Sequence, residues 1–207
     1  TGAATEDNST QITGSLAITD EDTGEAVFIP QANTAGTYGG FTLATDGNWT
    51  YDLDNANGTV QALINGATLT DSFTAASADG TQKQVTITIT GINGEATITG
   101  ASTGAATEDN STQVTGKLSV ADEDTGEAVF VAQANTAGTY GGFTLATDGN
   151  WTYDLDNANG TVQALINGDT LTDSFTAISA DGTGSQVVTV TITGINGEAT
   201  ITGTSTG

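Results

Sequence analysis

The sequence predicts an all-β protein made of two tandem β-sandwich domains, arranged end to end, with about seven strands in each. The first observation is a long internal repeat: TGAATEDNST begins at Thr1 and again at Thr103, and DEDTGEAVF, GTYGGFTLATDGNWTYDLDNANGTVQALING and ITGINGEATITG recur in the same order. A copy of about 100 residues is long enough to bury its own core. We therefore expect domains at 1–93 and 94–195. The tail, 196–207, either opens a further repeat or forms the last strand of the second domain.

The second observation is a series of short alternating apolar segments separated by turn residues, a pattern typical of strands. In the first copy we expect a strand at 11–19, an acidic turn at 20–24 and a second strand at 26–31. The best-specified hairpin surrounds Asp46-Gly47, because alternating apolar residues flank this turn dipeptide on both sides. The aromatic residues of this hairpin are expected to fill the core.

The second half of the copy contains a helical turn, two strands and a short strand-like segment, expected at 60–64, 69–77, 85–89 and 95–100. The helical turn is predicted from i, i+3, i+4 apolar spacing, and the segment 95–100 would open the following domain. We also expect the first copy to lack part of its opening strand. About seven strands with turn signals between them are the pattern of an immunoglobulin-like sandwich.

Composition excludes several classes of function. The chain of 207 residues has 25 acidic residues against two lysines, with no histidine, and a formal net charge of -23. Nucleic acids and anionic membranes are therefore disfavoured as partners, because binding phosphate groups requires Lys and Arg. With no Cys, His or Met, disulfides, zinc, copper and haem are disfavoured, and cations with oxygen ligands remain. The alternative is that the acids only form a solvated surface.

Strand direction predicts where the acids gather. In an antiparallel sandwich, successive loops alternate between the two ends, so Asp20, Asp22 and Asp79 should share one end. Glu6, Asp7, Asp54, Asn93 and Glu95 should share the other end, where they would face the first group of the next copy. Carboxylates brought together in this way repel one another unless a cation binds. Calcium, which takes six to eight oxygen ligands, fits better than magnesium.

Asp20-x-Asp22-x-Gly24 also resembles the start of an EF-hand loop, but the twelfth position is Gln31 rather than Glu. A complete EF-hand is therefore not expected. Asp71 and Asp173 each lie between Leu and Phe in a predicted strand and should point inward. Hydrogen bonding to the backbone is the expected role for both, with metal ligation as the alternative.

Several segments in order are similar to the VCBS-type repeat of giant bacterial RTX adhesins. They are DEDTGEAVF, GTYGGFTLATDGNWTYDLDNA, VQALINGATLTDSFTAASADGT and VTITITGING, and the resemblance covers essentially all of both copies. It implies calcium-stabilised immunoglobulin-like domains stacked as the extender of a surface adhesin. It also implies export by type I secretion, an extracellular location on the bacterial cell surface, and a role in biofilms.

The acidic turns also resemble those of cadherin repeats. Asp20-Glu-Asp22-Thr-Gly-Glu25-Ala is similar to DxDxGxNA, Leu53-Asp54 to the start of LDRE, and Ala78-Asp79 to AxD. Asn93-Gly-Glu95 stands where cadherins carry DxNDN, with one Asp and the usual proline absent. The strand argument, this resemblance and the repeat together predict the following calcium ligands: Glu6, Asp7, Asp20, Asp22, Glu25, Asp54, Asp79, Asn93, Glu95, Glu108, Asp109, Asp122, Asp124, Glu127, Asp156, Asp181, Asn196 and Glu198.

Three classes of function remain to be compared. The sequence favours a calcium-rigidified extracellular spacer, a monomer whose partners are neighbouring repeats of the same chain, without nucleic acid or direct membrane contact. The alternative is a carbohydrate- or surface-binding module in which Trp49, Tyr51 and Tyr38 contact the ligand. An enzyme is not expected, because no His, Cys, GxSxG motif or phosphate loop is present.

Overall fold

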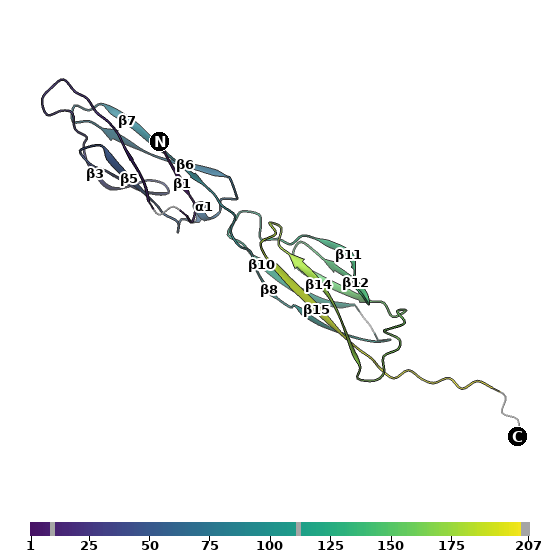
Figure 1. Cartoon of the computed structure of the whole chain (residues 1–207). Coiled ribbons are helices and arrows are strands. Elements are labelled where there is room, and N and C mark those ends of the chain that lie inside the picture. Colours follow the sequence, from purple (N-terminus) through teal and green to yellow (C-terminus); the bar gives the residue numbers. More distant parts are fainter. Residues whose placement is uncertain (9–10, 111–112, 204–207) are drawn as a thin grey trace. The chain divides into compact units, whose positions relative to one another are not determined.

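The computed structural model describes residues 1–8, 11–110 and 113–203, which form two compact units (Figure 1). The first unit holds Thr1–Gly94 together with Glu123–Thr125, and the second holds the rest of the chain. Each unit is a sandwich of two β-sheets around its own buried core. The predicted all-β fold with two tandem sandwich domains of about seven strands is therefore confirmed.

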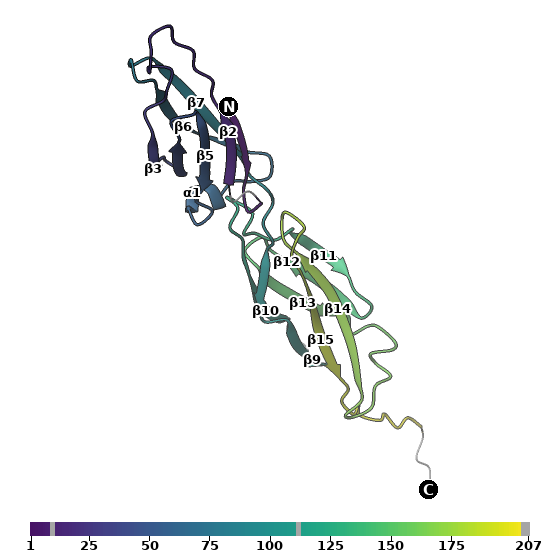
Figure 2. The same cartoon turned by 60° about the vertical axis from the view of Figure 1, so that its left-hand side comes forward.

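The first sandwich pairs a four-stranded sheet, in the order β2-β5-β4-β3, with a three-stranded sheet, in the order β1-β7-β6. Figure 2 shows β2 beside β5, with which it pairs antiparallel, whereas β1 runs parallel to β7. The strands are β1 (Gly2–Thr5), β2 (Gln11–Ser15), β3 (Gln31–Ala35), β4 (Gly39–Leu43), β5 (Asn48–Leu53), β6 (Thr68–Ala76) and β7 (Gln82–Thr90).

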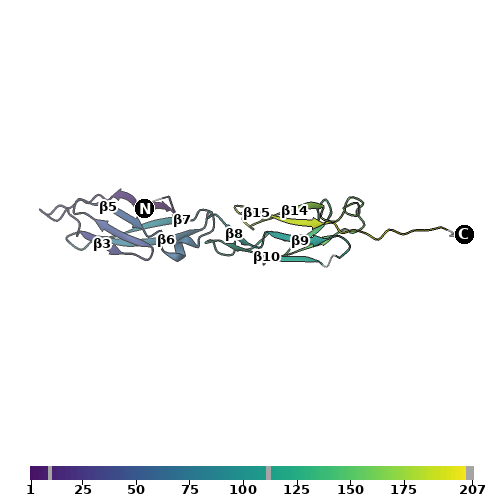
Figure 3. The ribbon, with the colours of Figure 1, turned by 90° about the horizontal axis from the view of Figure 1, so that it is seen from below.

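The second sandwich has a five-stranded sheet, in the order β11-β12-β13-β10-β8, and a three-stranded sheet, in the order β14-β15-β9. Figure 3 shows β14 beside β15, with which it pairs antiparallel. Its extra strand, β8 (Thr97–Gly100), pairs with β10 (Val114–Ala121), so the segment predicted to open the second domain does so. The remaining strands are β9 (Thr103–Thr107), β11 (Gln133–Ala137), β12 (Gly141–Leu145), β13 (Asn150–Leu155), β14 (Thr170–Ile178) and β15 (Ser185–Thr193).

A short helix, α1 (Gly58–Gln61), follows β5 where the sequence predicts a helical turn. Its N-cap is Asn57, whose side-chain oxygen accepts a hydrogen bond from the Thr59 amide at 2.9 Å. Val60 is fully buried against the core. Within the described residues, no helix is long and apolar enough to cross a membrane.

Aromatic side chains from both sheets form the centre of each core. The Phe41 ring lies 4.6 Å from that of Tyr51 and 4.5 Å from that of Phe73, measured between centroids. The same arrangement recurs in the second unit, where Phe143 contacts Tyr153 and Phe175. Alternation along β5 therefore places Trp49 and Tyr51 inside, as the sequence predicts.

The strand predicted at 26–31 is wrong. Residues 26–30 contribute only an isolated bridge between Phe28 and Ser77, and the regular strand β3 starts at Gln31. The missing N–H of Pro30 is not the cause, because β11 also begins at the equivalent Gln133 although Ala132 stands in the place of Pro30. The strand predicted at 11–19 ends at Ser15. Within 196–203, the described part of the tail, the structure has no strand.

Asp71 connects the two sheets at one end of the first sandwich. Its side chain is 5% exposed and accepts hydrogen bonds from the Thr37, Tyr38 and Ser72 amides and from the Tyr51 hydroxyl. Burial, together with the charge of Asp71, raises the pKa of Tyr51, which therefore stays a donor. The expected backbone role of this carboxylate is confirmed, and Asp173 repeats it in the second unit.

Candidate metal centre

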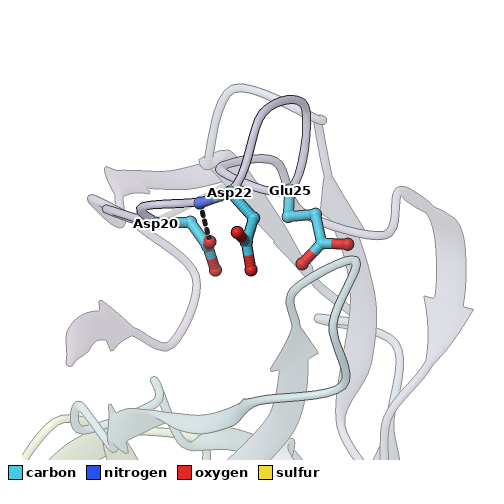
Figure 4. A group of neighbouring side chains, drawn as sticks. All are labelled: Asp20, Asp22 and Glu25. Carbon is cyan, nitrogen blue, oxygen red and sulfur yellow. Dashed lines mark hydrogen bonds between the residues drawn. The ribbon is translucent and has the colours of Figure 1, made fainter.

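The acidic loop between β2 and β3 brings three carboxylates together. Asp20, Asp22 and Glu25 each offer an oxygen, and these atoms all lie within 4.8 Å of one another. Figure 4 shows the three side chains projecting to the same side of the loop, with the Asp22 amide donating to Asp20 Oδ1 at 2.8 Å. Gly24, at φ +92°, provides the left-handed turn that aligns Glu25 with the two aspartates.

The second copy of this loop is more enclosed. Asp122, Asp124 and Glu127 also offer oxygens within 4.8 Å of one another. Asp124 is 4% exposed, and Asp122 and Glu127 are half-buried. The same three positions of the repeat therefore form an acidic group in both copies, although only Asp20, Asp22, Asp122 and Asp124 follow from strand direction.

Asp79 lies at the same end of the first sandwich as Asp20, as strand direction predicts. Both residues line one cavity of about 300 Å³. The Ser77 hydroxyl and then the Thr81 side chain and amide donate to Asp79, and these bonds lower the pKa of its carboxyl. Asp181 accepts hydrogen bonds from the Thr183 amide and hydroxyl at the equivalent place.

Glu6 and Asp7 lie together at the other end of the sandwich. Glu6 is 3% exposed and accepts a hydrogen bond from the Ile92 amide at 3.3 Å. Burial, and to a smaller extent the charge of Asp7, raises the pKa of Glu6. Asp7 adopts a left-handed backbone conformation, at φ 56°, and accepts a hydrogen bond from Gln61 Nε2 at 2.9 Å.

The second unit reproduces these contacts closely. Glu108 is 3% exposed and accepts from the Ile195 amide at 3.2 Å, and Asp109 accepts from Gln163 Nε2 at 2.8 Å. Asp54 and Asp156 each form a local turn by accepting from the amide two residues later. Backbone amides therefore hold the glutamates and the turn aspartates in both repeats, whereas glutamine side chains hold Asp7 and Asp109.

The remaining predicted ligands lie outside the two acidic loops in the sequence. Asn93 Nδ2 donates to the Gly94 carbonyl at 3.2 Å, and Glu95, Asn196 and Glu198 are exposed. The convergence of acids from both repeats on one site stays a prediction.

Two amide side chains that no sequence pattern selects, those of Asn55 and Gln61, lie at the end of the sandwich that holds Asp7. Asn55 Oδ1 accepts from the Asp7 amide at 3.3 Å, and Gln61 holds the Asp7 carboxylate. Asn157 and Gln163 repeat both contacts. The sequence carries little indication of these contacts, because they join residues 48 and 54 positions apart in a chain rich in polar side chains.

The donor set of the acidic loops fits calcium. All of the donor atoms are carboxylate oxygens, the ligands that Ca²⁺ prefers. Two oxygens on opposite sides of a Ca²⁺ ion lie about 4.6–5.2 Å apart, twice the usual 2.3–2.6 Å bond length. The spacing of at most 4.8 Å within each group is compatible with one shared ion. Asp20, Asp22 and Glu25, or Asp122, Asp124 and Glu127, would hold it.

Replacing Glu6 by glutamine is expected to raise the unfolding temperature in chelator and to reduce the further rise that calcium produces. In chelator at about pH 7, Glu6→Gln should raise the unfolding temperature, because it removes a charge that burial disfavours while an oxygen still accepts from Ile92. With calcium present, the variant should gain less stability than the natural chain if Glu6 is a ligand. Thermal unfolding of both proteins under both conditions measures the two effects.

The pH dependence supplies a control for this variant. Burial raises the folded-state pKa of Glu6 above the ordinary value of 4.5, so the fold favours the protonated carboxyl. This contribution to stability is complete below about pH 4.5 and is lost as the pH rises through the folded-state pKa. The difference between the variant and the natural chain in chelator should therefore shrink as the pH is lowered towards about 4. The exposed pair Asp52 and Gln11 gives the matched control, Asp52→Asn, which should show no such pattern. A Glu6→Gln variant that is less stable in chelator at neutral pH would contradict the interpretation.

Comparison with known proteins places this fold. The family model of the bacterial cadherin-like domain matches residues 1–91 and again residues 93–197. Among solved structures, PcdhgB3 EC1-4 is similar with a TM-score of 0.52 and 17% identity, over 93% of this chain and 47% of that one. Protocadherin gammaB7 EC3-6 gives 0.50 and 18%, over 92% and 45%. The human desmocollin-1 ectodomain gives 0.45 and 13%, over 96% and 41%.

The first two structural matches show the fold alone, because their sequence identity is low. The chain spans less than half the length of each of these three structures. No curated protein matches the sequence.

Proposed function

The chain belongs to the bacterial cadherin-like domain family, and we propose that it is an extender segment of a large bacterial surface adhesin, made rigid by calcium. Domains of this family are generally extracellular or surface-associated and typically non-catalytic. The observation that carries the proposal is the three-carboxylate loop, which occurs at the same place in both repeats. Oxygen-only donors at this spacing suit a calcium ion.

The three carboxylates of each acidic loop repel one another, so we expect the conformation of the loop to be more stable when a cation is bound. Asp20, Asp22 and Glu25 repel one another, and the only positive side chains in the whole sequence are two lysines. A bound calcium ion would neutralise part of this charge and link the three side chains. The loop lies between β2 and Phe28, so fixing its conformation also fixes the end of the sandwich.

The alternative, a glycan-binding module, is disfavoured by where the aromatic side chains lie. Trp49 is 4% exposed and Tyr51 is fully buried, so neither offers a ring face to a ligand. Tyr38 is half-buried and packs against the same core. The three residues singled out for this role therefore stabilise the sandwich.

The finer parts of the proposal rest on the VCBS-type resemblance. We infer that the parent protein is an RTX adhesin, exported by type I secretion and active at the cell surface or in biofilms. Neighbouring repeats of the same chain are its proposed partners, and nucleic acid and membrane lipid are not. Low calcium inside the cell would keep the acidic loops loose during export, and external calcium would then fix them.

Small-angle scattering of this two-repeat chain tests the proposed function. In millimolar calcium we expect the distribution of interatomic distances typical of a rigid rod of two domains, with a maximum at the width of one domain and a long tail. In excess chelator the profile should become that of a bent or expanded chain, because the acidic loops repel and loosen. The double variant Asp22→Asn with Asp124→Asn should show the chelator profile even in calcium. Identical profiles for the natural chain in both solutions would mean that the acids are only a solvated surface.

A further inference from the structure

The second repeat exposes three neighbouring apolar side chains at one end of its smaller sheet. Val131, Ile178 and Val187, called here the apolar patch, are 48%, 39% and 51% exposed. Ile178 lies on β14 and Val187 on β15, two strands that run side by side in Figure 2. Val187 stands opposite Thr176, two positions from Ile178. The Val131 amide donates to the Ile178 carbonyl at 2.9 Å, so Val131 lies beside Ile178.

The side chains of the apolar patch point away from the core. Their chain neighbours Phe130, Ala177 and Val188 are all buried. Because successive side chains of an extended chain point to opposite faces, the patch lies on the outer face of the sheet. Contiguous exposed apolar side chains mark surfaces that another molecule covers, whereas single ones are common on any protein.

The first repeat shows that the fold does not need this patch. Ile29, the counterpart of Val131, is 50% exposed, so this position is equally open in both repeats. Ala76 stands in the place of Ile178, however, and Gln84 in the place of Val187. The first repeat forms the same hairpin with these smaller or polar side chains. The two apolar residues of the second repeat are therefore not required for folding, which leaves a contact with another molecule as their role.

The rest of this outer face has no charge. All of its other positions on β9, β14 and β15 hold hydroxyl side chains or alanine: Thr103, Ala105, Thr107, Thr170, Thr172, Ser174, Thr176, Ser185, Thr189, Thr191 and Thr193. In a chain with a net charge of -23, two copies repel each other where acidic surfaces meet. On this face two copies can touch without bringing acidic groups into contact. A second copy also offers apolar side chains in the matching place.

We propose that two copies of this chain pair through this face, with their apolar patches in contact. The pair is two-fold symmetric, so Ile178 of one copy meets Val187 of the other, and the reverse. The strands of the two copies run antiparallel across the contact. Asp181 lies in the turn between β14 and β15, beyond the patch. In this orientation each Asp181 faces the hydroxyl side chains of the other copy rather than the other Asp181.

The size of the face predicts a weak pair. Three strands about 4.8 Å apart, each about nine residues long at about 3.3 Å per residue, cover about 400 Å². A standard interface buries about 800 Å² on each partner. We therefore expect single chains when the protein is dilute and pairs at higher concentration, in place of the monomer expected from the sequence.

The pairing is independent of the proposed function. The face contains none of the predicted calcium ligands, so the pair should form in chelator as well as in calcium. Monovalent salt should strengthen it, because salt screens the repulsion between two acidic chains. A contact made through calcium or through charged side chains would instead be lost in chelator or weakened by salt, and either result would overturn the proposal.

Sedimentation velocity over a range of concentrations tests the pair in chelator. The natural chain should show a mass that rises with concentration. Ile178→Ala together with Val187→Gln gives the second repeat the residues of the first, so the fold should be kept. This variant should weaken association about tenfold or more, because each substitution removes apolar contacts twice in a two-fold pair. Monomers of the natural chain at every concentration would overturn the proposal.

Two further variants provide the matched controls. Ile64→Ala together with Val27→Gln makes the same chemical changes at positions that are 43% and 40% exposed, outside the patch, and should leave association unchanged. Ala76→Ile together with Gln84→Val builds the patch into the first repeat and should strengthen association. Equal weakening by the patch variant and the Ile64 variant would show that the patch is not the contact.

Crosslinking tests the antiparallel arrangement. The chain has no cysteine, so one can be placed on the outer face of β14 and joined to its copy by a short thiol-reactive crosslinker. Thr176→Cys lies next to the patch and should give covalent dimers. Thr170→Cys lies about 20 Å further along the same strand, away from the two-fold axis, and should give few. Equal yields from the two exposed positions would overturn the arrangement.

Discussion

Replacing Asp71 by alanine is expected to lower the unfolding temperature of the first repeat by about 12–24 °C, the shift for a loss of about 3 kcal/mol in a domain of this size. The second repeat, which keeps Asp173, should unfold at its original temperature. The unaltered repeat therefore serves as an internal reference in the same calorimetric trace. Asp173→Ala should produce the reverse pattern.

The expected size follows from the hydrogen bonds that Asp71 accepts. The Tyr51 hydroxyl and the Thr37, Tyr38 and Ser72 amides donate at distances of 2.9–3.2 Å. A buried donor left without its acceptor costs about 1–3 kcal/mol. Alanine would leave the Tyr51 hydroxyl and the two amides of the β3–β4 turn without this acceptor. The loss would therefore destabilise both the turn and the contact between the sheets.

A graded series distinguishes this explanation from simple loss of packing. Tyr51→Phe removes one bond and should cost about 1–3 kcal/mol. Asp71→Asn keeps one oxygen but turns a donor group towards other donors, so it should lie between Tyr51→Phe and Asp71→Ala. Asp52→Asn, at an exposed position of β5, the strand that carries Tyr51, should change little. An Asp71→Ala chain as stable as Tyr51→Phe would show that the carboxylate does not organise the turn.

Most of the fold was accessible from the sequence because two independent signals agreed. The repeat set the domain size, and the alternation around Asp46-Gly47 set the hairpin that β4 and β5 form. The failure at β3 also has a physical cause. QANTA contains no branched or aromatic apolar residue, and it is mostly exposed, so alternation could not reveal it. The apolar run before it was mistaken for the strand because Phe28 is buried without being in a ladder.

The candidate site was accessible where its residues are close in sequence, or where strand direction determines the end of the sandwich at which they lie. Asp20, Asp22 and Glu25 lie in one loop, so spacing and resemblance could select them. Strand direction correctly put Asp79 at the same cavity as Asp20, although 59 positions separate them in the chain. Gln61 is not predictable from the sequence, because its contact with Asp7 depends on the placement of a four-residue helix, α1. Sequence patterns do not determine such placements.

Calcium is expected to raise the unfolding temperature of each repeat by about 10–20 °C. One site held at 100 times its Kd contributes about 2.7 kcal/mol when the unfolded chain does not bind, and a domain of this size shifts by about 4–8 °C for each kcal/mol. Differential scanning calorimetry in millimolar calcium and in chelator measures the change.

Substitution of one ligand per loop assigns the effect to these carboxylates. Asp22→Asn together with Asp124→Asn should remove most of the calcium-dependent gain, because each loop loses a charged donor. The same variant should be no less stable than the natural chain in chelator, where relief of repulsion favours it. Asp52→Asn together with Asp154→Asn makes the same charge change on exposed strand positions that hold only Gln11 and Gln113, so it should keep the full gain. If the loop variant and the strand variant respond equally to calcium, the ion acts through the overall charge of the chain, and the acidic loops are not its binding site.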